Sequence, residues 1–120
     1  MSGISMRALI IEPQVFASFM IEDALRDAGF DSIDLARSEE EALASADRDP
    51  PDLVTAAVEL DPGSGLRAVE RIRAKHSPAV LFITKRAAEL RRREPGATVV
   101  GKPFLASELP PAIAEASRRR

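Results

Sequence analysis

The sequence predicts an α/β domain in which helices cover both faces of a five-stranded parallel sheet, giving three layers. Five short apolar runs recur along the 120 residues, and patterns of helical spacing separate them. Three of the runs are almost continuously apolar, as strands buried on both faces must be. Strands that alternate with helices form parallel crossover units, so the pattern favours a parallel sheet over an antiparallel one.

The order of the predicted strands sets the positions of the helices and loops between them. They cover residues 8–11, 32–36, 53–57, 79–83 and 97–100. The first, third and fourth are the almost continuously apolar ones, which places them at the centre of the sheet.

Five helical patterns lie between and after these strands. The first places Phe16, Phe19 and Met20 at helical spacing and stops at Gly29, a common C-terminal residue. The second opens at Ser38 with Glu41 three residues later, which is the spacing of a capping box. The remaining helices are expected at residues 66–73, 87–93 and 107–117. Two prolines at 110 and 111 strain a first turn, so the last helix is expected to begin later than residue 107.

Composition narrows the function classes. Apolar residues make up 45% of the chain and charged residues 30%, which predicts one globular domain over residues 1–120, with 1–5 as a short disordered lead. A net charge of −2 gives no reason to expect nucleic acid as a partner. The absence of cysteine excludes thiolate metal and redox sites. No signal-like or membrane-spanning apolar stretch is present, so we expect no membrane association and a cytoplasmic location.

Candidate functional residues follow the strands at their carboxyl ends, where sites form in parallel sheets. Glu12 follows the first strand, and Ala57 ends the third. Thr84 ends the fourth strand, and Lys102 follows the fifth. Four loops therefore converge with an acid, a methyl group, a hydroxyl and an ammonium.

In the order and spacing of its motifs, the chain resembles the receiver domain of bacterial response regulators. The matching segments are Leu9-Ile10-Ile11-Glu12, Glu22-Asp23-Ala24-Leu25, Ala28-Gly29, Pro51-Asp52-Leu53-Val54, Gly65-Leu66, Ile83-Thr84, Gly96-Ala97 and Lys102-Pro103-Phe104. The resemblance implies a flavodoxin-like (βα)5 fold with an acidic Mg²⁺ pocket. It also implies an aspartate that accepts a phosphoryl group at the end of strand three, a Thr and a Lys that grip that group, an aromatic switch residue on strand five, and a cis peptide before Pro103.

This chain departs from the implied pattern at three positions. Pro13 replaces the second metal-binding acid, Ala57 replaces the phosphoacceptor, and Val99 stands at the switch position. The fourth helix is also short by about one turn. Together with Phe82 and Thr84, that shortening resembles a receiver branch with an F-A-T-G-Y stretch.

The departures predict a pseudo-receiver that is not an enzyme and has no catalytic residue. A methyl group cannot form an acyl phosphate, and one carboxylate is a poor Mg²⁺ site, so metal binding is expected to be lost or weak. Lys102 is expected to pair with Glu12, because a buried ammonium needs a partner. For the Thr84 hydroxyl, bonding to nearby backbone and a vestigial phosphate-binding role stay open. The side chain of Glu59 is expected to point toward solvent.

The resulting function hypothesis is a stand-alone atypical receiver in phosphorelay signalling that acts by binding a protein. Its partner would be a histidine kinase, a phosphotransferase or another signalling protein, and the chain itself a monomer or weak homodimer. The candidate docking face is the basic cluster Arg86, Arg91, Arg92 and Arg93, for which a merely solvated helix surface is the alternative. Two other functions stay open: a phosphorylatable switch that uses Glu59 or Asp61, and a small-ligand sensor in the vacated pocket.

Overall fold

The computed structural model describes residues 5–119 and confirms the predicted fold class. Strands and helices alternate as β1 (Arg7–Ile11), α1 (Val15–Asp27), β2 (Ser32–Ala36), α2 (Glu39–Arg48), β3 (Leu53–Ala57), α3 (Gly65–Arg73), β4 (Ala79–Thr84), α4 (Ala87–Arg93), β5 (Thr98–Gly101) and α5 (Leu109–Arg118). All strand pairs are parallel, and the strand order in the sheet is β2-β1-β3-β4-β5. The order reverses between β1 and β3, so the switch point lies beside the loops that follow these two strands.

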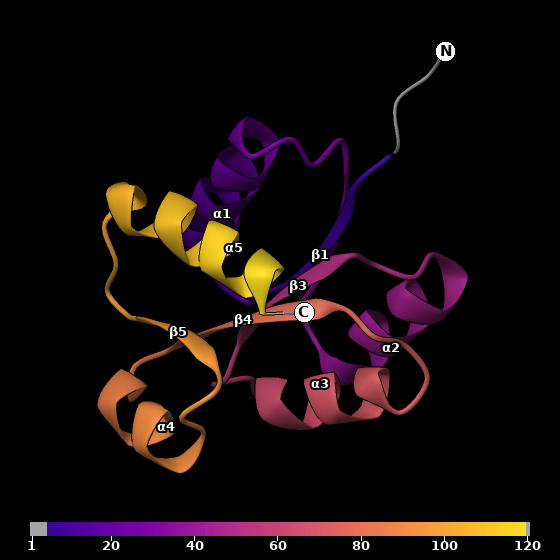
Figure 1. Ribbon diagram of the computed structural model, residues 1–120. Coiled ribbons are helices and arrows are strands. Elements are labelled where there is room, and N and C mark those ends of the chain that lie inside the picture. The colour runs from indigo at the N-terminus through magenta and orange to yellow at the C-terminus, as the bar shows by residue number, and fades with distance from the viewer. Residues whose placement is uncertain (1–4, 120) are drawn as a thin grey trace.

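The helices form two layers around the sheet. Helices α1 and α5 lie side by side over one face, whereas α2, α3 and α4 cover the other (Figure 1). None of the helices within residues 5–119 is long and apolar enough to cross a lipid bilayer. Of the expected lead, residues 1–4 lie outside the described part, and the Ser5 hydroxyl donates to Asp31 Oδ1 at 3.2 Å.

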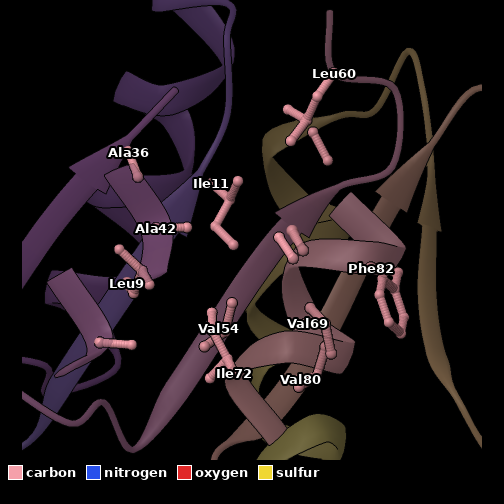
Figure 2. Close-up of a cluster of buried hydrophobic side chains, with 14 of the residues drawn as sticks. Leu9, Ile11, Ala36, Ala42, Val54, Leu60, Val69, Ile72, Val80 and Phe82 are labelled. Atoms are coloured by element: carbon pink, nitrogen blue, oxygen red, sulfur yellow. The ribbon is translucent and has the colours of Figure 1, made fainter. Parts of the chain in front are cut away.

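The period-two geometry of a strand explains how one sheet supplies two cores. Along β1, Leu9 and Ile11 pack toward α2 and α3, while Ala8 and Ile10 pack toward α1 and α5. Figure 2 shows the first of these cores, in which side chains from β1, β3 and β4 meet those of α2 and α3. Because both faces of the central strands are buried, their sequences are apolar throughout, as predicted.

The helix ends follow their capping residues. The Ser38 side chain accepts the Glu41 N–H at the start of α2, as predicted, while the Glu41 carboxylate accepts the N–H of Arg37 rather than that of Ser38. Helix α5 begins at Leu109, after a single 3-10 turn at Ala106–Glu108, which confirms the later start that the tandem prolines predict. The Lys102–Pro103 peptide is cis, as the resemblance implies.

The apolar spacing in the first helix does not by itself say which face meets the core, and the structure shows it. The buried face of α1 consists of Ala17, Ser18, Ile21, Ala24 and Leu25. Phe16 and Phe19 instead point outward, with exposed fractions of 85% and 61%. Their helical spacing therefore marks a second, exposed apolar stripe and not the side that faces the core.

Candidate functional site

Glu12 and Lys102 join the loops after β1 and β5 at the carboxyl edge of the sheet. Lys102 Nζ lies 3.0 Å from Glu12 Oε2, and the two side chains are 11% and 0% exposed. The same carboxylate oxygen accepts the Gln14 N–H at 3.0 Å, and Lys102 Nζ also donates to Gln14 Oε1 at 3.2 Å. The structure thus confirms the predicted ion pair and shows that it is buried.

The acids at this edge do not make a suitable Mg²⁺ site. Pro13 is exposed and has no side-chain oxygen. One carboxylate oxygen of Glu12 already accepts a hydrogen bond from Lys102. The other oxygen, Glu12 Oε1, is buried without a hydrogen-bond partner within residues 5–119. No group of three or more His, Asp or Glu side chains gathers anywhere in that range. Since Mg²⁺ needs near-octahedral oxygen ligands, one half-engaged carboxylate does not fit it.

Ala57 closes the floor of the site at the end of β3. It is 1% exposed and packs in the core cluster shown in part in Figure 2. The start of α3 presses against it, because a Cβ on Gly65 would lie 2.0 Å from the Ala57 carbonyl oxygen. The backbone of this strand end is therefore tightly fixed, while its side chain offers a methyl group and no nucleophile.

The Thr84 hydroxyl is hydrogen-bonded to the carboxylate of Glu59. The hydroxyl donates to Glu59 Oε2 at 2.6 Å and accepts the Arg86 N–H at 3.0 Å. Glu59 Oε1 also accepts the Lys85 N–H at 3.1 Å. Glu59 is exposed, as expected, but its carboxylate also bonds to these two donors on the β4–α4 segment, which the sequence did not reveal. The hydroxyl does bond nearby backbone, which was one of the two alternatives.

The loop that carries Glu59 is held in place from α2. The Glu39 carboxylate accepts the Ser64 N–H at 2.9 Å and pairs with Arg71 at 3.2 Å. The Ser64 N–H, followed by Arg71 and Arg67, lowers the pKa of Glu39 below its ordinary value. Asp61 is exposed within this loop, at a turn completed by Gly63 with φ of 97°. It is therefore placed as a turn residue, away from the bonds that Glu59 makes.

The switch position and the basic face lie beside each other on β5 and α4. Val99 is 9% exposed and packs in the core, and its carbonyl accepts the Arg91 guanidinium at 2.9 Å. Arg86 forms an ion pair with Glu89 of α4, with 3.7 Å between Arg86 Nη1 and Glu89 Oε2. Arg92 and Arg93 are exposed and form no ion pair within the described residues. Within the predicted docking face, the Arg91 side chain is therefore held by its hydrogen bond to β5, whereas Arg92 and Arg93 remain available to a partner.

Comparison with known proteins agrees with this geometry. The family model described as the response regulator receiver domain matches residues 8–114. Transcriptional regulatory protein PdtaR of Mycobacterium tuberculosis is 30% identical over 116 residues, which is 93% of this chain and 57% of that protein. Protein-glutamate methylesterase/protein-glutamine glutaminase of Haloarcula marismortui is 35% identical over 83 residues, 69% of this chain and 22% of that protein. The chain thus spans less than two thirds of either relative.

Solved structures give the same result. The response regulator PhyR from Brucella abortus matches with a TM-score of 0.86 and 30% identity, over 96% of this chain and 49% of that one. The PhyR receiver domain from Erythrobacter litoralis matches with a TM-score of 0.81 and 34% identity, over 93% and 89%. With its sheet order and these matches, the chain belongs to the response regulator receiver domain family and is a receiver domain of two-component signalling.

Proposed function

We propose that this receiver signals without phosphoryl transfer, by binding a protein partner in a single fixed conformation. One observation carries the proposal: each side chain that would grip a phosphoryl group is already bonded within the chain. Lys102 is paired with Glu12, Thr84 is bonded to Glu59, and an alanine stands at position 57. A ligand that brings no differential interaction energy cannot shift a conformational equilibrium.

The chemistry of phosphoryl transfer supports this proposal. The reaction needs an oxygen nucleophile in line with the phosphorus, and cations that neutralise the spreading charge. The Ala57 methyl provides no nucleophile, and the Lys102 charge is compensated by Glu12 at 3.0 Å. We also expect the Mg²⁺ affinity of the pocket to be weak, because its one carboxylate, Glu12, is already paired with Lys102.

Intact-mass measurement tests the loss of phosphorylation directly. The protein is incubated with acetyl phosphate and Mg²⁺ beside a receiver that retains its aspartate. We expect the mass of this chain to stay unchanged while the control gains one phosphoryl group. A stoichiometric gain in this chain would contradict the proposal.

A surrogate phosphoacceptor is the second candidate, and one contact favours it. The Glu59 carboxylate lies on the Thr84 hydroxyl, the residue that grips the phosphoryl group in the family. If a phosphoryl adduct forms, Glu59→Gln should abolish it, whereas Asp61→Asn should leave it in place. The opposite pattern would assign the adduct to Asp61.

The partner, we propose, is another signalling protein: a histidine kinase, a phosphotransferase, or a regulator that an active receiver would otherwise bind. PhyR of Bartonella quintana, 27% identical over 96% of this chain, is described as an anti-anti-sigma factor, which adds sigma-factor regulators to the candidates. The proposed docking face is formed by α4, β5 and α5. Its exposed Arg92 and Arg93 suit an acidic surface and would steer the encounter.

The docking face is tested with a charge-reversed variant. Arg92→Glu with Arg93→Glu should lower the association rate for a partner recovered with the wild-type chain, and the loss should shrink as salt is added. Arg37→Glu is the matched control, since Arg37 is also exposed and its side chain forms no ion pair within residues 5–119. Equal affinities for the two variants would place the interface elsewhere.

A further inference from the structure

The outward face of α1 carries an apolar stripe that nothing in the described chain covers. Phe16 and Phe19 are 85% and 61% exposed, and Asp23 continues the same stripe at a spacing of three and four residues. Residues at such spacing share one face of a helix, opposite the buried Ile21 and Leu25. Two neighbouring exposed phenyl groups mark an interaction surface more often than chance exposure does.

A groove lies directly beside this stripe. It encloses about 510 Å³ and is lined by Gln14, Ala17, Met20, Lys85, Lys102, Pro103 and Phe104. Met20 lies four residues after Phe16, so the groove and the stripe share an edge of α1. Leu105, next to the groove-lining Phe104, is 70% exposed. The groove is therefore apolar in its floor and continues onto apolar surface on both sides.

The charges around the groove are complementary to the charge on the stripe. The Lys85 side chain is exposed and forms no ion pair within residues 5–119, while Lys102 is paired with Glu12. Asp23, on the stripe, is exposed and likewise forms no ion pair in that range. One chain thus presents phenyl groups with a free acid, and beside them an apolar groove with a free ammonium.

We propose that this surface binds a second copy of the chain, with the two α1 helices antiparallel across a two-fold axis. Phe16 and Phe19 of each copy would enter the groove of the other, and Asp23 would meet the partner's Lys85. A two-fold interface requires one patch that is complementary to itself, and this patch contains both halves. Its centre, α1, lies on the opposite face of the sheet from α4, which carries Arg92 and Arg93 of the proposed docking surface.

Helix geometry is consistent with that arrangement. Gln14, which lines the groove with Lys85, and Asp23 are nine residues apart, or about 14 Å along the helix. An antiparallel pair centred near Phe19 brings Asp23 of each copy to the Gln14 end of the other. The phenyl groups then lie at the centre of the interface, where buried aromatic residues contribute most to binding.

Sedimentation velocity over a wide concentration range tests the apolar contact. The wild-type chain should show a dimer whose fraction rises with concentration. Phe16→Ser with Phe19→Ser should raise the dissociation constant by more than about tenfold. Leu35→Ser is the control, because Leu35 is 45% exposed on the edge strand β2, and it should leave dimerisation unchanged.

A charge exchange tests the pairing itself. Asp23→Lys and Lys85→Asp should each weaken the homodimer by about tenfold, because each places like charges opposite one another twice. An equal mixture of the two variants restores both contacts, so it should form a heterodimer with wild-type affinity. A wild-type chain that stays monomeric at millimolar concentration, phenyl variants that dimerise like the wild type, or a mixture no tighter than its components would each overturn the proposal.

Discussion

Removing the Lys102 ammonium is expected to destabilise the fold far more than removing its Glu12 partner. In Lys102→Met, the Glu12 carboxylate remains fully buried; within residues 5–119 the Gln14 N–H is then its one donor, and Oε1 has none. An uncompensated buried charge costs about 3–5 kcal/mol. In Glu12→Gln, the ammonium keeps Gln14 Oε1 as an acceptor and is 11% exposed, so the expected cost is about 1–3 kcal/mol.

Urea unfolding followed by circular dichroism measures these free energies for the two single variants and the double variant. We expect the unfolding free energy of all variants to fall with urea concentration at the same slope (equal m values). We also expect a coupling energy between Glu12 and Lys102 of about 2–3 kcal/mol. The Glu22–Arg26 pair on α1 is the control, because its side chains are 40% and 52% exposed. Its coupling should be about 0.3–0.5 kcal/mol. Equal coupling in the two pairs, or equal losses in the two single Glu12 and Lys102 variants, would refute the reasoning.

Three further outcomes are expected. Ala57→Asp alone should not restore labelling by acetyl phosphate, because Pro13 provides no second carboxylate for Mg²⁺. Labelling as strong as in an ordinary receiver would show that Glu12 alone is enough to bind the metal. Gly65→Ala should destabilise the fold by about 1–3 kcal/mol in urea unfolding, since its Cβ would lie 2.0 Å from a backbone oxygen. The Ser45 hydroxyl, aided by Arg7 and Arg48, lowers the pKa of Asp34 below its ordinary value. A carboxylate whose pKa is lowered in the folded state stabilises the fold at pH values above its unfolded-state pKa. That stabilisation is lost as the pH falls through the folded-state pKa. Stability should therefore drop below about pH 4, and Ser45→Ala should flatten that drop, whereas an unchanged pH profile would contradict the assignment.

The backbone of the fold was accessible from sequence because burial on both faces of a strand leaves a direct pattern. Residues 53–57 and 87–93 were predicted with the bounds that the structure has. The Glu12–Lys102 contact was also accessible, since the carboxyl ends of parallel strands meet at one edge and a buried cation needs an acid.

Side-chain directions in loops and on helix surfaces were not accessible in the same way. Glu59 sits in a loop, where no periodicity sets its orientation, and the donors that attract it come from the β4–α4 segment, 25 and 26 residues away. Arg91 fits a solvated helix face by pattern, yet its length lets it reach the Val99 carbonyl. Phe16 and Phe19 fit a helical spacing without revealing which face meets the core, because smaller residues at 17, 21 and 24 pack there instead.

The central claim, that this receiver acts without phosphoryl chemistry, is tested most directly by an NMR titration with beryllofluoride and Mg²⁺, observed at the Thr84, Lys85 and Lys102 amides. These amides lie on the segments whose side chains or backbone would grip the phosphoryl analogue, and Glu59 and Glu12 already occupy the Thr84 hydroxyl, the Lys85 N–H and the Lys102 ammonium. The account predicts no saturable shift at millimolar metal. A saturable shift that requires Mg²⁺ would contradict it and restore a phosphorylation switch.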